Sequence, residues 1–252
     1  MRRVIASLLV LAGISTWVPT VLAQPIDTTR VHLGPADGGT DAFVAWPTGK
    51  AAAPGVVVVH EWWGLNAQIR AVAWRLAKEG YVAIVPDLYH GKMATDPEQA
   101  HVLSRGLEDP VAYGDLEAAA SWLRGQPRLA RKRIGVMGFC MGGGLALGLA
   151  LRDSTISATE MFYGAPVNDP AQLASLRGPV QGHFGEKDDG IPPPKADSFR
   201  SALKQAGKEG EVYVYAGAGH AFMNETRPSY HADAARQAWA RTLAFFQKNL
   251  KR

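Results

Sequence analysis

The only cysteine of the chain, Cys140, occupies the position best suited to covalent chemistry. It lies within Gly138-Phe139-Cys140-Met141-Gly142-Gly143-Gly144, between a short apolar stretch that predicts a strand and a small-residue stretch that predicts a helix. This layout fits the nucleophile elbow, Gly-x-nucleophile-x-Gly, whose glycines leave room for neighbouring backbone. A lone cysteine is more often a small buried hydrophobic residue, but the flanking glycines weigh against that interpretation. The spacing matches neither G-x-G-x-x-G nor a Walker loop, so we interpret Cys140 as a nucleophile.

Three further side chains with catalytic chemistry follow other predicted strands. They are Glu61, Asp188 and His220. Each has a simpler interpretation, as a solvated loop carboxylate, a turn built from Asp and Gly, and a surface histidine respectively. Ligands of open α/β sheets collect at the carboxyl ends of the strands, so the shared placement of these residues favours a common site.

The chain order Cys140, Asp188, His220 is the order nucleophile, acid, base of an α/β-hydrolase triad. A thiolate needs a neighbouring imidazole to lower its pKa from about 8.5. The imidazole in turn needs an acceptor on its second nitrogen to fix its tautomer. The three residues therefore predict acyl transfer through a thioester. We expect Asp188 to face the ring, with the adjacent Asp189 as the alternative acid.

The elements that must position these residues alternate strand and helix over most of the chain. Continuous apolar runs indicate strands covered on both faces, and apolar residues at helical spacing indicate helices. The pattern predicts an α/β fold with a mostly parallel central sheet and helices on both faces. The expected strands are an antiparallel pair within 30–46, then 55–60, 81–85, 133–137, 159–163, 178–184 and 211–215; the expected helices are 66–78, 96–107, 114–125, 145–151, 194–206 and 229–250.

Residues 1–23 differ from the rest of the chain. Arg2 and Arg3 precede an apolar run, and Val21-Leu22-Ala23 ends in the small-x-small manner of a signal-peptidase site. We predict a signal peptide cleaved after Ala23, a single domain over 24–252, and a periplasmic or secreted protein without stable membrane association. The alternative, an uncleaved anchor, is disfavoured because polar residues interrupt an apolar stretch that is short for a bilayer span of about 20 residues.

Composition limits the other classes of function. The 252 residues are 47% hydrophobic and 20% charged, which suits one globular domain. Without Arg2 and Arg3, the 27 basic residues become 25, against 23 acidic ones. No basic run with interleaved aromatic residues is present, so we expect no nucleic-acid partner. A single cysteine allows no internal disulfide, and we expect no metal and no cofactor.

Six short motifs, in order and over essentially the whole mature chain, carry a more specific signal. They are His60-Glu61-Trp62-Trp63-Gly64-Leu65-Asn66, Pro86-Asp87-Leu88-Tyr89, Gly114-Asp115-Leu116-Glu117-Ala118-Ala119, Gly138-Phe139-Cys140-Met141-Gly142-Gly143, Asp188 with Ile191-Pro192, and Ala218-Gly219-His220-Ala221-Phe222. Together they resemble the dienelactone hydrolase family, the cysteine-using branch of the α/β-hydrolase fold. The resemblance implies that fold and the hydrolysis of an ester, lactone or thioester.

The resemblance also implies a role for each polar residue. Cys140 would be the nucleophile, His220 the base and Asp188 its orienting acid. Glu61 would contact the resting thiol and help to generate the thiolate when substrate displaces it. The backbone N–H groups of Trp62 and Met141 would form the oxyanion hole.

The expected substrate contacts are Trp63, Tyr89, Tyr163, Arg105 and Asn224. In members of the family that cleave dienelactone, two arginines bind the substrate carboxylate. Leu103 and Asn224 occupy the corresponding positions here, so we leave open whether nearby Arg105 or Arg227 replaces them.

The substrate is therefore expected to be a small ester or lactone, and the protein a monomer. Two other functions remain open at this stage. One is a secreted ligand-binding protein on an inactive hydrolase scaffold, which the missing arginines suggest. The other is an acyltransferase that uses the same thiol.

Overall fold

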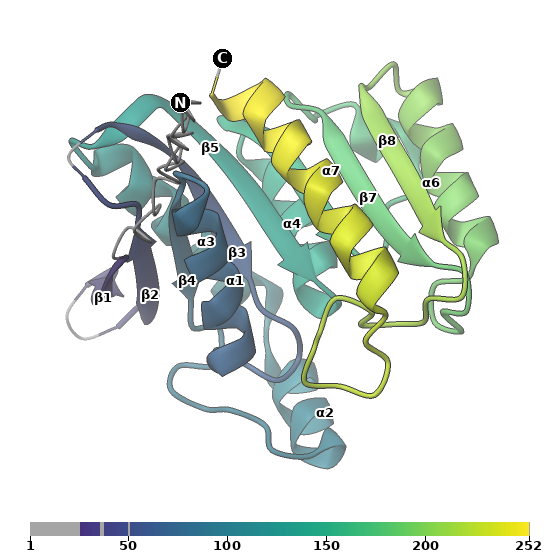
Figure 1. Ribbon diagram of the computed structural model, residues 1–252, viewed down its shortest axis with the longest axis horizontal. Helices are drawn as coiled ribbons and strands as arrows, with labels where there is room; N and C mark the ends of the chain where they lie inside the picture. Colours follow the sequence, from purple (N-terminus) through teal and green to yellow (C-terminus); the bar gives the residue numbers. More distant parts are fainter. Residues whose placement is uncertain (1–25, 36–37, 50, 252) are drawn as a thin grey trace, which may run out of the picture.

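The structure is a computed structural model that describes residues 26–35, 38–49 and 51–251. Within these residues an eight-stranded sheet has the order β1-β2-β4-β3-β5-β6-β7-β8 (Figure 1). The strands β1 and β2 pair antiparallel, β2 pairs antiparallel with β4, and the remaining pairs are parallel. Their bounds are β1 Asp27–Leu33, β2 Thr40–Trp46, β3 Ala53–Val59, β4 Val82–Pro86, β5 Leu129–Phe139, β6 Ile156–Phe162, β7 Val180–Gly185 and β8 Gly210–Tyr215.

Helices cover both faces of this sheet. The helices α1 and α7 pack on one face, and α3, α4 and α6 pack on the other (Figure 1). Strand β3 divides its valines between the two layers, with Val57 and Val59 on the α3 and α4 side and Val56 and Val58 on the α1 and α7 side. The helix bounds are α1 Ala67–Lys78, α2 Pro97–Gly106, α3 Asp109–Gly125, α4 Met141–Arg152, α5 Pro170–Leu173, α6 Pro193–Gln205 and α7 Ala232–Leu250.

This architecture confirms the predicted α/β fold with a mostly parallel sheet, but some boundaries differ. Helix α3 begins at Asp109, five residues before the expected start, because Pro110 in its first turn is compatible with a helix start. Helix α4 begins directly at Met141, so the glycines after Cys140 form its first turn. Helix α7 begins only at Ala232, where the His231 side chain accepts a hydrogen bond from the N–H of Ala234. The short helix α5 was not predicted.

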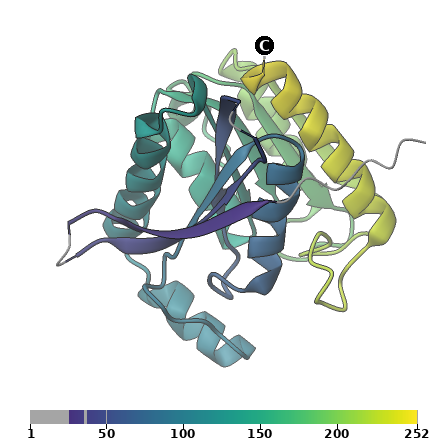
Figure 2. The same cartoon turned by 60° about the vertical axis from the view of Figure 1, so that its left-hand side comes forward.

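The loops at the carboxyl ends of the parallel strands lie together at one edge of the sheet. Helix α2 extends from this edge, away from the body of the molecule (Figure 2). Only Ala100 of α2 is buried, and Val102 is 64% exposed. The long loop between β8 and α7 reaches towards the same edge (Figure 1). The edge is therefore walled by loops from both halves of the sheet.

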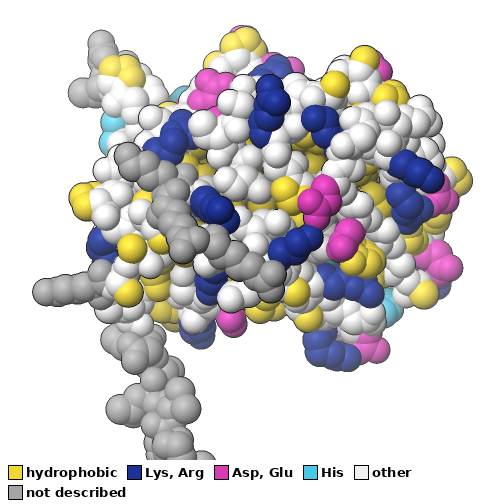
Figure 3. Space-filling model, turned by 90° about the horizontal axis from the view of Figure 1, so that it is seen from above, with side chains coloured by type: hydrophobic (Ala, Val, Ile, Leu, Met, Phe, Trp, Pro, Cys, Tyr) yellow, Lys and Arg dark blue, Asp and Glu magenta, His cyan; other side chains and the backbone are white. Residues whose placement is uncertain are grey.

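The opposite end of the molecule, at the amino ends of the parallel strands, carries Lys and Arg side chains interspersed with Asp and Glu (Figure 3). Within the part of the chain that the structure describes, no helix has the length and apolar character needed to cross a bilayer. The predicted signal, residues 1–23, lies outside the described residues, and so does the proposed cleavage point.

Candidate active site

Cys140 lies at the turn between β5 and α4 with φ = 55°, a left-handed conformation that residues other than glycine rarely adopt. The neighbouring glycines are required by close backbone contacts. A Cβ at Gly138 would lie 1.9 Å from the Gly142 carbonyl oxygen, and one at Gly142 would lie 2.4 Å from that of His60. The predicted strand, strained turn and helix around the cysteine are therefore confirmed. The cysteine is partly exposed at the turn.

His220 comes from the loop between β8 and α7 and pairs with the acid that follows β7. Its Nδ1 lies 2.7 Å from Asp188 Oδ2. The other oxygen of Asp188 accepts the backbone N–H groups of Gly190 and Ile191, at 2.9 and 3.0 Å. Asp188 is 2% exposed, whereas Asp189 faces solvent. Asp188 rather than Asp189 is thus the acid at the ring.

The pair is charged. Burial alone would lower the pKa of His220, but hydrogen bonds with Asp188 and with the Cys140 thiol outweigh it and raise the pKa to about 10. Burial alone would raise the pKa of Asp188, but the hydrogen bonds from His220 and from the loop N–H groups lower it overall. Since Nδ1 is held by Asp188, Nε2 is the ring nitrogen left for the thiol. The structure thus brings Cys140, Asp188 and His220 together.

Glu61 follows β3 and is 4% exposed. Its Oε1 accepts a hydrogen bond from the Tyr163 hydroxyl at 3.0 Å, and its Oε2 accepts one from Asn224 Nδ2 at 2.7 Å. Burial raises the pKa of Glu61, and these two donors partly counter that rise. The expected contact with the thiol stays a prediction, because the carboxylate's hydrogen bonds are to Tyr163 and Asn224.

Backbone strain is concentrated at this site. Among the described residues, four other than glycine have positive φ, and three of them are Cys140, Tyr163 with φ = 38° and Ala221 with φ = 59°. Each follows the end of a strand or lies in the loop that carries His220. Such conformations cost about 1–3 kcal/mol each and persist where the surrounding packing imposes them.

A cavity of about 510 Å³ opens beside the thiol. Most of its lining is apolar, and besides His220 it includes the cationic side chain of Arg227, whose guanidinium lies 3.6 Å above the Trp63 ring. The lining residues are Glu61, Trp62, Trp63, Cys140, His220, Ala221, Arg227, Pro228 and Ser229. The loop residues 228 and 229 were not predicted, since Pro and Ser after a catalytic histidine carry no distinctive signal.

The residues predicted to contact substrate lie in different parts of the structure, and only some of them line the cavity. Trp63 lines the cavity, whereas Tyr163 and Asn224 are buried behind Glu61. Arg105 is exposed on α2 and does not line the cavity. Of the two nearby arginines, Arg227 is therefore the one that reaches the site.

Tyr89 links the two residues whose N–H groups are expected to form the oxyanion hole. Its hydroxyl lies 3.2 Å from the carbonyl oxygen of Trp62 and 3.5 Å from the sulfur of Met141. Met141 is the first residue of α4, so its N–H has no partner within the helix. The contacts of Tyr89 thus hold the β3 and β5 loops next to each other.

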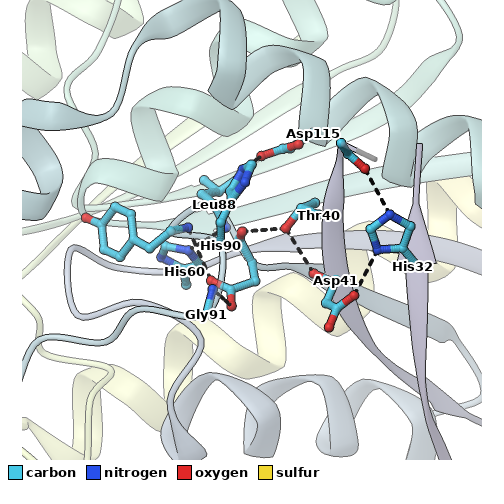
Figure 4. A network of polar contacts seen from close by, with 11 residues as sticks. His32, Thr40, Asp41, His60, Leu88, His90, Gly91 and Asp115 are labelled. Atoms are coloured by element: carbon cyan, nitrogen blue, oxygen red, sulfur yellow. Dashed lines mark hydrogen bonds and ion pairs between the residues drawn. The ribbon is translucent and has the colours of Figure 1, made fainter. Parts of the chain in front are cut away.

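A buried polar network supports these loops from behind (Figure 4). His60 lies 2.6 Å from the carbonyl oxygen of Glu61 through Nδ1, and its Nε2 accepts the N–H of Leu88. Asp87 accepts the N–H of Gly91 at 2.8 Å, and its own carbonyl accepts the Thr40 hydroxyl at 2.6 Å. His60 has no exposed surface. The supporting role of His60 was not predicted. The signal that could have indicated it is a histidine directly after an apolar strand.

No group of three or more His, Cys, Asp or Glu side chains in the described part of the chain is arranged to hold a metal ion.

Residues 40–250 of the chain match the model of the dienelactone hydrolase family. A Methylorubrum extorquens protein named "Putative carboxymethylenebutenolidase" is 32% identical over 269 aligned positions, which cover 98% of this chain and 92% of that protein. The crystal structure of a Klebsiella pneumoniae protein named "Putative Dienelactone Hydrolase" is 30% identical, with a TM-score of 0.81, and covers 89% of this chain and all of that chain.

A more distant structure, the acylaminoacyl peptidase of Pyrococcus horikoshii, is 18% identical with a TM-score of 0.70. It covers 90% of this chain and 42% of the peptidase, and it shows the shared fold alone. The family match spans most of the chain, and the fold agrees with it. This chain belongs to the dienelactone hydrolase family and is a hydrolase with the α/β-hydrolase fold.

Proposed function

We propose that this protein hydrolyses small esters or lactones through a thioester on Cys140. The observation that carries the proposal is the position of His220, which contacts Asp188 at 2.7 Å and also hydrogen-bonds the thiol. This is the arrangement that converts a cysteine into a nucleophile and supplies a base for the second step. Family membership alone would leave the reacting atom unassigned.

In the first step the sulfur of Cys140, with its proton held on Nε2 of His220, attacks the substrate carbonyl carbon. The negative charge that develops on the carbonyl oxygen is stabilised by the N–H groups of Trp62 and Met141. His220 then returns the proton to the leaving alkoxide, and the acyl group remains on Cys140. Water, deprotonated by His220, attacks the thioester and releases the acid with the thiol. Asp188 keeps the ring oriented through both steps.

The cavity supports a small substrate with an anionic group. A volume of about 510 Å³ falls within the usual range of small-molecule sites, about 300–1,000 Å³. The Arg227 guanidinium is the cationic group of the lining outside the catalytic pair, and its buried Nε has no hydrogen-bond partner within the described residues. A carboxylate on the substrate would supply that partner. The carboxymethylenebutenolidase name of the relative fits a lactone of this kind.

The central test measures hydrolysis of short p-nitrophenyl esters and of lactones by the wild type and by Cys140→Ala. We expect turnover by the wild type, loss of at least about 10³-fold in the variant, and an acyl-enzyme adduct at Cys140 in mass spectrometry. Equal rates in the two proteins would refute the proposal. Ligand binding that survives Cys140→Ala without turnover by the wild type would favour the binding-protein alternative, and product partitioning towards added alcohol would favour the acyltransferase.

The role of Arg227 is tested by comparing a pair of esters that differ only in a carboxylate. For Arg227→Gln we expect kcat/KM for the anionic ester to fall about tenfold or more, with little change for the neutral ester. Arg75→Gln is the matched control, because Arg75 also stacks on a tryptophan, Trp239, at 3.9 Å but lies outside the cavity. An equal loss for both esters would exclude recognition of charge.

We also propose export, with cleavage after Ala23, and a monomeric mature protein. The support is the charged and then apolar N-terminus with its small-x-small ending. N-terminal sequencing of the protein from a periplasmic fraction should begin at Gln24. Light scattering of that material should give the mass of one chain; retention of Met1 in the isolated protein would contradict export.

A further inference from the structure

The carbonyl oxygen of Glu61 and the N–H of Trp62 belong to the same peptide unit. The described residues contain no cis peptide bond, so this unit is trans. In a trans peptide the C=O and the N–H point in opposite directions, and a contact that fixes the carbonyl also fixes the N–H. The Trp62 N–H is one of the two donors of the proposed oxyanion hole. The partners of the Glu61 carbonyl therefore decide where that donor points.

His60, directly after β3, holds this carbonyl with its side chain. Its Nδ1 lies 2.6 Å from the Glu61 oxygen. Gly64, with φ = 86°, donates its N–H to the same oxygen at 3.2 Å and so closes the turn that follows β3. The backbone turn needs no particular side chain before it. The contact from His60 is the one that depends on the residue type at position 60.

The tautomer of His60 follows from a backbone donor. The N–H of Leu88 lies 3.3 Å from Nε2 and can only donate, so Nε2 carries no proton (Figure 4). The ring has no exposed surface, and burial lowers the pKa of His60, so the ring stays neutral. A neutral imidazole without a proton on Nε2 carries it on Nδ1. His60 Nδ1–H therefore donates to the Glu61 carbonyl.

The next two peptides of the loop after β3 are held as well. The Tyr89 hydroxyl lies 3.2 Å from the Trp62 carbonyl oxygen, and the Ala94 N–H donates to the Trp63 carbonyl at 3.1 Å. The rings of His60 and Tyr89 also meet edge-on, with 5.1 Å between their centroids. Three successive carbonyls thus have a donor each. The donor from His60 is the one that acts on the peptide with the oxyanion-hole N–H.

The second donor of the proposed hole, the N–H of Met141, is presented by a helix turn that packs on His60. A Cβ at Gly142 would lie 2.4 Å from the His60 carbonyl oxygen and 2.5 Å from that of Val59. Gly142 belongs to the first turn of α4, which begins at Met141. The side chain of His60 therefore fixes the peptide of one donor, and its backbone contacts the turn that presents the other.

We propose that His60 is a positioning residue of the oxyanion hole, whose Nδ1–H aims the Trp62 N–H at the substrate carbonyl oxygen. The hydrogen bond to the Glu61 carbonyl also polarises the shared peptide, which strengthens its N–H as a donor. The inference rests on the proposed function and specifies what prepares the stabilisation of its transition state. His60 does not line the cavity, so its effect on the reaction passes through this peptide.

The test compares two reactions of Cys140 in the wild type and in His60→Phe, which keeps a flat ring and removes both nitrogens. Hydrolysis of p-nitrophenyl acetate forms an oxyanion in acylation and again in deacylation. Alkylation by iodoacetamide displaces iodide from a saturated carbon and forms none. For His60→Phe we expect kcat to fall at least about thirtyfold with KM within about threefold, because loss of one oxyanion-hole donor costs about 10²–10³-fold. The alkylation rate should stay within about threefold of wild type.

Two further variants separate positioning from general damage. His60→Asn places an amide NH₂ near the position of Nδ1 and should recover kcat to within about tenfold of wild type. His183→Phe is the matched control, because His183 is also fully buried and neutral and contacts two polar groups, but it lies in β7 and does not line the cavity. It should lower stability and leave the ratio of the hydrolysis rate to the alkylation rate unchanged.

Inhibition by phenylacetaldehyde measures the oxyanion hole without turnover. The Cys140 sulfur adds to the aldehyde carbon, and the thiol proton neutralises the resulting oxygen, which lies where the oxyanion would form. For His60→Phe we expect the inhibition constant to rise at least about tenfold. The constant for 2-phenylethanol, which has no carbonyl, should stay within about twofold of wild type.

The outcomes are distinct. Equal losses of hydrolysis and alkylation in His60→Phe would overturn the positioning role, and so would a kcat within about threefold of wild type. If circular dichroism shows His60→Phe to be unfolded, ¹⁵N spectra of the wild-type ring decide, because a proton on Nε2 instead of Nδ1 would overturn the proposal. A wild type that hydrolyses no ester would refute the proposed function, and the aldehyde constants would still decide on His60. Ester turnover with unchanged constants in His60→Phe would refute only the positioning.

Discussion

Of the histidine–carboxylate pairs in the described residues, two with similar distances differ in place, and only one of them lies at the active site. His220 and Asp188 are 2.7 Å apart at the carboxyl edge of the sheet. His183, on β7, and Glu160, on β6, are 2.9 Å apart within the sheet. The residue types and distances are nearly the same. Their protonation states differ, because the first pair is ionic and the second is neutral.

Solvent access and backbone donors account for the difference. Both side chains of the His183–Glu160 pair, here called the inner pair, are fully buried. Burial therefore lowers the pKa of His183 to about 3 and raises that of Glu160 well above its usual value. The pair is therefore neutral, with its proton on Glu160. In the His220–Asp188 pair, here called the outer pair, 40% of the His220 side chain is exposed and Asp188 accepts hydrogen bonds from two backbone N–H groups, so this pair is ionic. A His–carboxylate contact does not by itself indicate a catalytic pair.

The largest expected effect follows from the ionic state of the outer pair. Asp188→Asn replaces an acceptor of the ring N–H and should lower kcat/KM for an ester by about 10⁴-fold, because the imidazole loses its tautomer and orientation. Asp189→Asn is the control and should retain activity within about twofold. Steady-state hydrolysis of p-nitrophenyl acetate measures both variants. A loss below tenfold in Asp188→Asn would contradict a catalytic role for the His220–Asp188 pair.

The inner pair should matter for stability alone. Glu160→Ala leaves His183 without its donor and opens a cavity, so the free energy of unfolding should fall by about 2–4 kcal/mol. Glu160→Gln should cost about 1 kcal/mol or less, because an amide can donate to His183 as the protonated acid does. Urea unfolding measures both, with kcat/KM expected within about threefold of wild type. Comparable damage from Gln and Ala would argue against a neutral Glu160.

The protonation states themselves can be observed. In ¹⁵N spectra of the histidine rings at pH 7, His220 should carry two protons and His183 one. Cys140→Ala should lower the pKa of His220 by about one unit or more, since the thiol helps to raise it. The His183 signal should not move in that variant, and a shift of both rings would mean that the two pairs are coupled.

The smallest effect is expected at the far side of the inner pair. Tyr215 contacts His183 Nδ1 through its hydroxyl at 2.7 Å. Tyr215→Phe should lower the free energy of unfolding by about 1 kcal/mol, the net contribution of one buried hydrogen bond, without a change in kcat/KM. Tyr213→Phe serves as the control, because the Tyr213 hydroxyl donates to the exposed Glu211 at 2.6 Å, and it should change stability by no more than about 0.5 kcal/mol.

Much of the site could be predicted because its residues follow strands. Glycine spacing around Cys140 indicates a backbone that a side chain would obstruct, and parallel strands bring their carboxyl ends to one edge. The same reasoning placed Asp188 and His220 together. It could not have predicted the support from His60, because a hydrogen bond to the carbonyl of Glu61 depends on the exact path of the turn.

Asn224 shows why the rest required the structure. From the sequence it corresponded to a substrate-binding arginine and was expected to contact substrate. In the structure it is fully buried and donates to Glu61 instead. Arg227, three residues later, lines the cavity because the intervening turn, in which the Arg227 N–H donates to the Asn224 carbonyl, rotates successive side chains in different directions.

The sequence by itself determined the order of the strands and of the helices other than α5, the elbow at Cys140 and the three residues that meet there, because these depend on local periodicity and on the rule that strand ends converge. Only the tertiary structure decided which charges those residues carry and which neighbours hold Glu61. Protonation depends on burial and on donors from other elements, and residues such as Glu61, Tyr163 and Asn224 meet only when β3, β6 and the loop after β8 are packed together.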